Sequence, residues 1–192
     1  MRLLEIEDLS VSIGSKQVLK NFNLRINKGE THALFGPNGT GKTTLLNVIA
    51  GIPRYTVDGG RIVFKGQDVT RMSMDERARL GIGMAFQRPP AIRGLRLKDL
   101  IKIINPQADA QAILKKMDFE AFAERDVNRG FSGGEVKRSE MVQLLAQQPD
   151  FVMLDEPDSG VDLENIKLIG EAINALTQKD QRPSYRTKSG VI

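Results

Sequence analysis

The 192 residues, 40% hydrophobic and 27% charged with a formal net charge of +4 at pH 7, fit one soluble globular domain with a substantial core. The absence of cysteine excludes disulfides and thiolate metal sites within the chain, and the interspersed basic and acidic residues predict no nucleic-acid partner. No apolar run reaches the length of a membrane span and the first residues lack a signal-peptide profile, so we expect a cytoplasmic protein.

The first predicted elements are strands. Residues 3–13 and 18–26 alternate polar and apolar side chains with a period of two, which predicts an antiparallel edge pair. The short run 31–35 is expected to be a buried strand that leads into a glycine-rich loop.

That loop, residues 36–43, fits G-x-x-x-x-G-K-[ST], the phosphate-binding P-loop. Its glycines let backbone N–H groups converge on an anion, and a helix predicted over 44–50 points its positive end at the same place. Lys42 can reach the terminal phosphates of a nucleoside triphosphate and is a predicted catalytic residue, while the Thr43 hydroxyl can ligate magnesium. An ordinary glycine turn is the alternative. The predicted nucleotide ligands are Gly36, Pro37, Asn38, Gly39, Thr40, Gly41, Lys42, Thr43 and Thr44.

Strand and helix signals alternate in the rest of the chain, which predicts an α/β domain around a mostly parallel sheet. A strand over 60–64 with its turn at 65–68 precedes a capping box at Ser73 and a short helix that ends at Gly81. Further predicted elements are a strand over 82–86, a small helical insertion over about 88–130 with amphipathic segments at 97–104 and 108–117, a helix over 132–147, a strand over 151–154, a helix over 163–177 and a polar loop over 178–190.

Two carboxylates follow the apolar strand 151–154. Beside bound phosphates, one carboxylate can hold magnesium through water and the next can activate water. An apolar strand that simply ends in a solvated loop gives the same pattern, but a P-loop upstream favours the catalytic interpretation. Asp155 is therefore the predicted magnesium ligand and Glu156 the predicted general base.

Ser132 begins a second glycine-rich motif, Ser-Gly-Gly-Glu, at the start of the predicted helix 132–147. Ser132 and Glu135 alone form a capping box, which needs no glycine. Two glycines at the first helical positions cost about 1 kcal/mol each relative to alanine. That cost indicates a backbone that lies against a bulky anion. Lys137 and Arg138 are expected on a solvated face of this helix.

These motifs together resemble the ATPase domains of ABC proteins. Residues 131–135 resemble the family's signature motif, Gln87 its Q-loop, and residues 158–162 its D-loop. The resemblance implies a single ABC ATPase domain over 1–192, an α/β P-loop NTPase with antiparallel edge strands that uses ATP and Mg²⁺. It also implies a nucleotide-dependent head-to-tail homodimer in which Ser132, Gly133 and Gly134 bind the partner's nucleotide. Gln87 would be catalytic and contact the magnesium ion.

Several segments resemble, within that family, the ATPase subunit of the SUF iron–sulfur cluster assembly system: residues 30–33, 55–60, 85–89, 130–138 and 158–160. This implies a soluble motor that acts on a scaffold protein. The alternative is the ATP-binding subunit of a membrane transporter, which would act on transmembrane permease subunits. Residues 88–129 would contact the partner in either case.

A third interpretation is an ATP-binding module that does not hydrolyse ATP. Family members carry a switch histidine after a strand that residues 189–192 resemble, and the only histidine here is His32, expected to be hydrogen-bonded within its strand. We therefore expect a fragment that lacks the C-terminal part. The aromatic residue that stacks on adenine is replaced by Ile13, with Tyr55 as a substitute or a plain surface residue.

Overall fold

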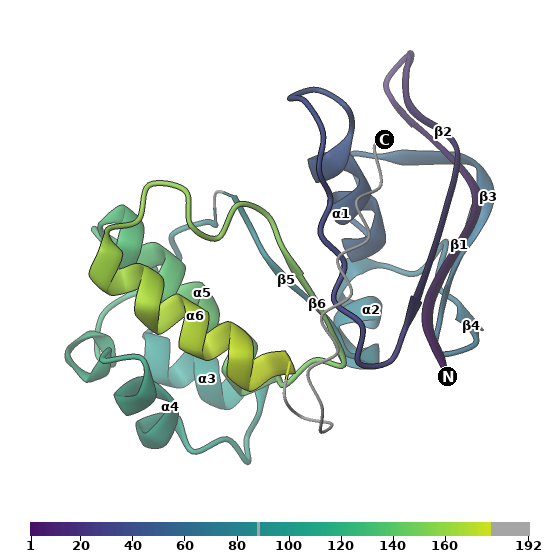
Figure 1. Ribbon diagram of the computed structural model, residues 1–192. Coiled ribbons are helices and arrows are strands. Elements are labelled where there is room, and N and C mark those ends of the chain that lie inside the picture. The colour runs from purple at the N-terminus through teal and green to yellow at the C-terminus, as the bar shows by residue number, and fades with distance from the viewer. Residues whose placement is uncertain (88, 178–192) are drawn as a thin grey trace. The chain divides into compact units, whose positions relative to one another are not determined.

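The structure is a computed structural model that describes residues 1–87 and 89–177 (Figure 1). It divides into two compact units: Met1–Ile82 form the first, and the second begins at Gly83 and holds the later described residues. The predicted loop at 178–190 and the strand expected to begin at 189 lie outside the described residues. Each unit has its own buried apolar residues.

The first unit is built on a four-stranded sheet in the order β2-β1-β3-β4. Its strands are β1 (Arg2–Ile13), β2 (Lys16–Asn27), β3 (Thr56–Phe64) and β4 (Gln67–Asp68), and every pairing is antiparallel. The predicted antiparallel pair is confirmed. The third strand begins at Thr56, four residues earlier than expected, and the predicted turn at 65–68 narrows because its last two residues form β4.

A bulge in β1 keeps its apolar side chains on the core face. The buried residues Leu4 and Ile6 have even numbers, whereas the buried residues Leu9 and Val11 have odd numbers. The change of parity falls at Asp8, whose φ of 47° is in the left-handed region. The pairing of β1 with β2 also shifts register there. Across from it, a Cβ on Gly60 would lie 2.3 Å from the Glu7 carbonyl oxygen, so only glycine fits there.

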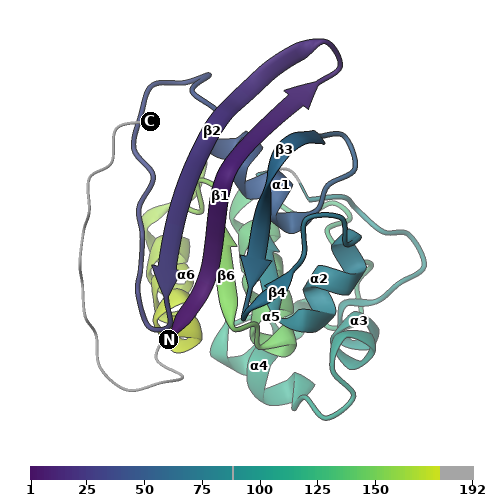
Figure 2. The same cartoon turned by 90° about the vertical axis from the view of Figure 1, so that its right-hand side faces the viewer.

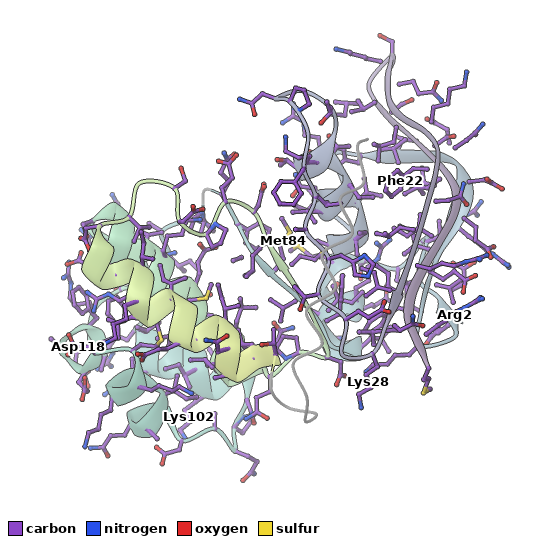
Figure 3. The ribbon with its side chains drawn as sticks, in the orientation of Figure 1. Arg2, Phe22, Lys28, Met84, Lys102 and Asp118 are labelled. Atoms are coloured by element: carbon purple, nitrogen blue, oxygen red, sulfur yellow. The ribbon has the colours of Figure 1, made fainter. Side chains whose placement is uncertain are left out.

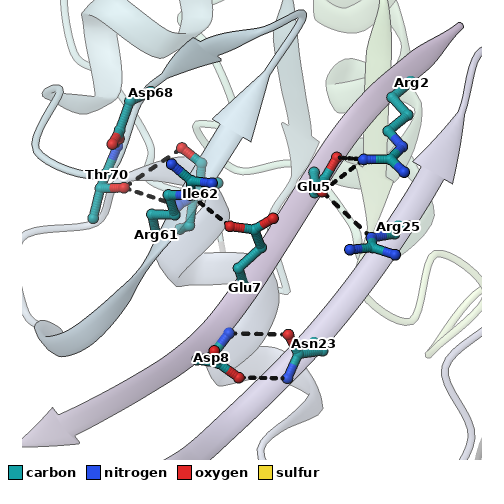
Figure 4. Close-up of polar contacts among 10 residues, drawn as sticks. All are labelled: Arg2, Glu5, Glu7, Asp8, Asn23, Arg25, Arg61, Ile62, Asp68 and Thr70. Carbon is teal, nitrogen blue, oxygen red and sulfur yellow. Dashed lines mark hydrogen bonds and ion pairs between the residues drawn. The ribbon is translucent and has the colours of Figure 1, made fainter.

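Polar contacts cover the open face of this sheet (Figure 4). Asp8 and Asn23 hold the bulge, because the Asp8 N–H donates to Asn23 Oδ1 and Asn23 Nδ2 donates to Asp8 Oδ1, each at 3.0 Å. The ion pairs on the same face are Arg2 and Arg25 with Glu5, and Arg61 with Glu7. Such exposed pairs add little stability, so the register depends on the buried apolar residues of the opposite face.

Two helices lie on the other face of the sheet, α1 (Lys42–Ala50) and α2 (Met74–Leu80), as Figures 1 and 2 show. The predicted capping box opens α2: the Ser73 side chain accepts from the Glu76 N–H, and the Glu76 carboxylate accepts from the Ser73 N–H at 2.7 Å. The predicted end of α2 at Gly81 is confirmed, with Gly81 as its C-cap (φ 106°), and Gly51 (φ 84°) is the C-cap of α1.

The second unit places helices around a two-stranded sheet, β5-β6. Its elements are β5 (Ile82–Ala85), α3 (Leu97–Ile104), α4 (Ala110–Lys116), a 3₁₀ turn η1 (Glu120–Phe122), α5 (Gly133–Gln147), β6 (Phe151–Leu154) and α6 (Leu163–Thr177). The helices and strands predicted over these stretches are confirmed. α5 and α6 pack side by side, and Lys102 and Asp118 mark the solvent side of the α3 and α4 region (Figure 3).

One predicted strand is wrong. Residues 31–35 form no strand, and their side chains alternate between exposed and half-buried rather than being buried. Phe35, at the entrance to the P-loop, is 56% exposed. A strand requires a paired neighbour, and a short apolar run in the sequence cannot show whether one is present. The chain therefore enters the P-loop with single β-bridge positions at Glu30 and Phe35 but without a strand between them.

Candidate functional site

The P-loop leads directly into the first turn of α1. Gly39 and Gly41 have φ of 85° and 96°, and a Cβ on Gly41 would lie 2.9 Å from Leu19 Cδ2. Gly41 is the N-cap of α1 and offers no side-chain cap, and the first turn of α1 holds no acidic residue. No side chain therefore caps this helix end, and its positive dipole favours an anion there.

Lys42 folds back over the loop that it follows. Its Nζ donates to the carbonyl oxygens of Gly36 at 2.7 Å and Pro37 at 3.0 Å, and the Thr40 hydroxyl also donates to the Pro37 oxygen at 2.9 Å. These contacts hold the loop closed around its own ammonium group. Because the loop is exposed, phosphate oxygens can approach this ammonium group and the adjacent backbone N–H groups.

In the second unit, the ends of β5 and β6 bring Gln87 and Glu156 together. Gln87 Nε2 donates to Glu156 Oε2 at 3.3 Å. Asp155 is 7% exposed, whereas Glu156 is exposed and has a φ of 49°, in the left-handed region that non-glycine residues rarely adopt. The turn that follows, in which the Ser159 N–H donates to the Glu156 carbonyl oxygen at 3.1 Å, supports this conformation. An exposed carboxylate beside a carboxamide can hold and activate a water molecule.

Ser132 caps α5 as predicted. Its hydroxyl accepts from the Glu135 N–H at 3.3 Å, and its own N–H donates to Glu135 Oε2 at 2.7 Å. Sequence reasoning missed a second reason for the two glycines. A Cβ on Gly134 would lie 2.7 Å from Asn165 Nδ2, and one on Gly133 would lie 3.3 Å from the Gly160 carbonyl oxygen. The first turn of α5 thus packs closely against the loop before α6 and the first turn of α6.

An aromatic cluster fixes the residue that precedes Ser132. The Phe131 ring meets Phe122 edge-on with centroids 5.1 Å apart, and Phe119 at 5.7 Å. The Arg125 guanidinium lies 4.8 Å from the Phe122 centroid and 4.7 Å from the Phe131 centroid. This packing joins η1 to the start of α5.

The expected solvated face of α5 is wrong for Lys137 and Arg138, whose side chains are 7% and 12% exposed. Lys137 Nζ donates to the Phe86 carbonyl oxygen at 2.9 Å and pairs with Glu140. Arg138 donates to the Asp118 carbonyl oxygen at 2.9 Å, and its guanidinium lies 4.9 Å from the centroid of an aromatic ring. Charged helix residues are usually solvated, so their sequence carried no sign of this burial.

His32 and Tyr55 take local roles. His32 Nε2 lies 3.1 Å from Glu30 Oε2, so the predicted hydrogen bond is present although the strand around it is not. Hydrogen bonds from Asn27, and then from His32, lower the pKa of Glu30 to about 2. The Tyr55 hydroxyl accepts from Asn47 Nδ2 at 2.9 Å, which ties its loop to α1.

The donor chemistry of the predicted magnesium ligands fits Mg²⁺. Thr43, Gln87 and Asp155 all offer oxygen atoms, which Mg²⁺ prefers, and nucleotide-bound Mg²⁺ commonly takes only one or two protein ligands beside phosphates and water. Over residues 1–87 and 89–177, His, Asp and Glu side chains do not gather in threes that could hold a metal ion by themselves.

Residues 19–159 match the sequence profile of a family described as ABC transporter. The chain belongs to this family. It is 41% identical over 193 residues to a probable ATP-dependent transporter, ycf16, of Pyropia yezoensis, and the match covers 92% of the chain and 77% of the relative. A probable ABC transporter ATP-binding protein of Streptococcus pyogenes serotype M3 is 40% identical, with 94% and 76% covered.

Solved structures agree. A nucleotide-free ATP-binding cassette from an ABC transporter superposes with a TM-score of 0.77 at 28% identity, covering 93% of the chain and 78% of that structure. The ATP-binding subunit of an ABC transporter gives 0.79 at 24% identity, covering 92% and 75%, which supports the fold. The predicted α/β fold of an ABC ATPase domain with a P-loop is therefore confirmed. None of the helices among the described residues is long and apolar enough to cross a bilayer.

Proposed function

We propose that the chain is a Mg²⁺-dependent ATPase that acts as one domain and pairs head to tail with a second copy when ATP binds. The P-loop residues from Gly36 to Thr44 would hold the phosphates. Thr43, Gln87 and Asp155 would hold the magnesium ion, which supplies charge stabilisation at the phosphates. Glu156 would be the general base, and the second copy's Ser132, Gly133 and Gly134 would complete the nucleotide site.

The observation that carries the proposal is the state of Lys42 and the helix end beside it. The Lys42 ammonium group lies on loop carbonyls, next to a helix N-terminus with no side-chain cap and no acidic residue in its first turn. This arrangement would favour a multiply charged anion. The contact between Gln87 and Glu156 supports the part of the proposal that concerns ATP hydrolysis. The chain's relatives include ATP-binding proteins by name, and a structural neighbour at 24% identity is a dimer bound to ADP and phosphate.

Glu156→Gln tests the general base. The change keeps the size of the side chain but removes its basicity, so we expect ATP turnover to fall about 10²-fold or more and an ATP-bound dimer to accumulate. Phosphate release and size-exclusion chromatography with Mg·ATP measure the two effects. Glu171→Gln, an exposed change on α6, is the matched control. Turnover at the parental rate in Glu156→Gln would refute the assignment.

We further propose that this ATPase is the cytoplasmic motor of SUF-type iron–sulfur cluster assembly and drives a scaffold protein. The support comes from the sequence segments that resemble the SUF ATPase, above all Asp158-Ser159-Gly160. Because the chain has no cysteine, cluster ligands would belong to the scaffold. The names of the relatives favour the second candidate, the ATP-binding subunit of a membrane transporter.

Affinity purification of the tagged chain from its native cells separates these two functions. Recovery in the soluble fraction with a cysteine-containing scaffold protein is the outcome expected for cluster assembly. Recovery with multi-span proteins in the membrane fraction would establish the transporter function instead.

A further inference from the structure

The backbone of Phe86, directly before Gln87, is held by α5 at both its N–H and its carbonyl oxygen. Lys137 Nζ donates to the Phe86 carbonyl oxygen at 2.9 Å, and the Phe86 N–H donates to Glu140 Oε1 at 2.5 Å. Both charged side chains are buried, at 7% and 4% exposed, and their Nζ and Oε2 atoms lie 3.4 Å apart. The backbone on the N-terminal side of Gln87 is thus fixed by two directional contacts.

A buried ion pair is often less stabilising than apolar side chains of the same volume. Removing two charges from water costs more than their attraction commonly returns, and apolar residues of the same volume often serve as well. Burial raises the pKa of the Glu140 carboxyl, which is the physical sign of that cost. A pair of this kind is explained when its directional bonds fix something that apolar packing would leave loose.

The pair stands at the polar end of a stripe along α5 that faces β5. Lys137, Glu140, Leu144 and Gln147 recur every three or four residues, so they share one face of the helix. At the other end of the stripe, a Cβ on Gly83 would lie 2.9 Å from Leu144 Cδ2 and 3.0 Å from Gln147 Oε1. β5 therefore lies directly on this stripe from Gly83 to Phe86, and Gln87 is the first residue beyond it.

We propose that Lys137 and Glu140 are positioning residues that hold Gln87, through the backbone of Phe86, where it can serve the magnesium ion. This rests on the role proposed above for Gln87. Lys137 lies one turn beyond Ser132, Gly133 and Gly134, so the same contacts join Gln87 to the helix end that would meet the second copy's nucleotide. A displacement of that helix end would then move Gln87 with it.

The test is the gain in ATP affinity that Mg²⁺ brings, measured by calorimetry with Mg·ATP and with ATP in EDTA. Residues behind a metal ligand typically change metal affinity 10- to 100-fold, so Lys137→Met should lower the Mg²⁺ gain about 10-fold and leave the affinity in EDTA unchanged. Lys137→Arg, which can still donate to the Phe86 oxygen, should restore most of the gain. Arg138→Met is the matched control, since Arg138 is buried on the same helix but its contacts are with Met117, Asp118 and Phe119.

Gln87→Ala separates this inference from the function on which it rests. We expect Gln87→Ala to lose the Mg²⁺ gain, and Lys137→Met to add nothing in that background. If Gln87→Ala keeps the gain, the magnesium role of Gln87 and this inference both fail. If Gln87→Ala loses it but Lys137→Met matches Arg138→Met, the inference alone is overturned. Should Lys137→Met not fold, Lys137→Gln, too short to span the same distance, serves in its place with the same expected loss.

Discussion

At the scale of single residues, Gly134 is a position where two constraints, packing against Asn165 and the proposed nucleotide contact, both favour glycine. The sequence pattern ascribes this glycine to a bound anion, whereas the structure shows that Asn165 occupies the space of a Cβ. Asn165 cannot easily withdraw, because its Nδ2 donates to both carboxylate oxygens of Asp162 at 2.9 and 2.8 Å. The fold therefore requires Gly134 whether or not a nucleotide does.

A double-mutant cycle separates the two constraints. Gly134→Ala should destabilise the chain by about 1–3 kcal/mol through overpacking, despite the higher helix propensity of alanine. Combined with Asn165→Ala, the same change should lose most of its cost, because the clash is gone. Urea unfolding measures both effects. Equal costs in the two backgrounds would contradict the contact.

The same double variant then reports on the nucleotide. If the second copy's ATP lies against this helix end, Gly134→Ala with Asn165→Ala should be stable and yet fail to dimerise with Mg·ATP, which size-exclusion chromatography measures. Asn165→Ala alone is the control. A stable double variant that dimerises like the control would show that Gly134 serves the fold only.

At the scale of elements, the sequence predicted the capped helices correctly, whereas the strand that it predicted over residues 31–35 is not formed. Capping depends on local chemistry, so the sequence indicates where capped helices begin and end. The capping residues are Ser73 and Ser132 at helix starts and Gly51 and Gly81 at helix ends. The run 31–35 depends on a neighbour that local sequence does not specify. The predicted solvated position of Lys137 is wrong for a related reason, since its partner Phe86 is 51 residues away along the chain.

Arg77 is another buried charge that the sequence did not reveal, and it joins the two helices of the first unit. Its Nη1 donates to the carbonyl oxygens of Val48 at 2.6 Å and Ile49 at 2.9 Å, in the last turn of α1. Its Nε and Nη2 donate to the Met72 and Thr70 carbonyl oxygens. One guanidinium thus satisfies the end of the helix that the P-loop begins.

Removing this group should destabilise the chain. We expect Arg77→Met to lower the free energy of unfolding by about 1.5–3 kcal/mol, the usual worth of hydrogen bonds to a charged group. Arg79→Met is the control on the same helix, because its side chain is 77% exposed and its solvent-exposed ion pair with Asp75 contributes little to stability. Urea denaturation of both variants checks this. Equal losses would contradict the capping role of Arg77.

At the scale of the whole molecule, the motifs that the sequence identified are divided between two compact units. The P-loop belongs to the first, and Gln87, Ser132, Asp155 and Glu156 belong to the second. Motif order along the chain was enough to predict the family, because each motif is a short local pattern. The contacts inside each unit, such as Gln87 with Glu156, required the fold.

The central claim is that the P-loop of this chain binds the phosphates of ATP, and calorimetric titration with Mg·ATP tests it most directly. Wild-type chain should bind, and Lys42→Ala should lose about 1.5–3 kcal/mol, roughly 10- to 100-fold in affinity, because an ammonium–phosphate contact is removed. Lys20→Ala, an exposed change on β2, should bind like wild type. Absence of binding heat from folded wild-type chain, or equal affinity in Lys42→Ala, would contradict the claim.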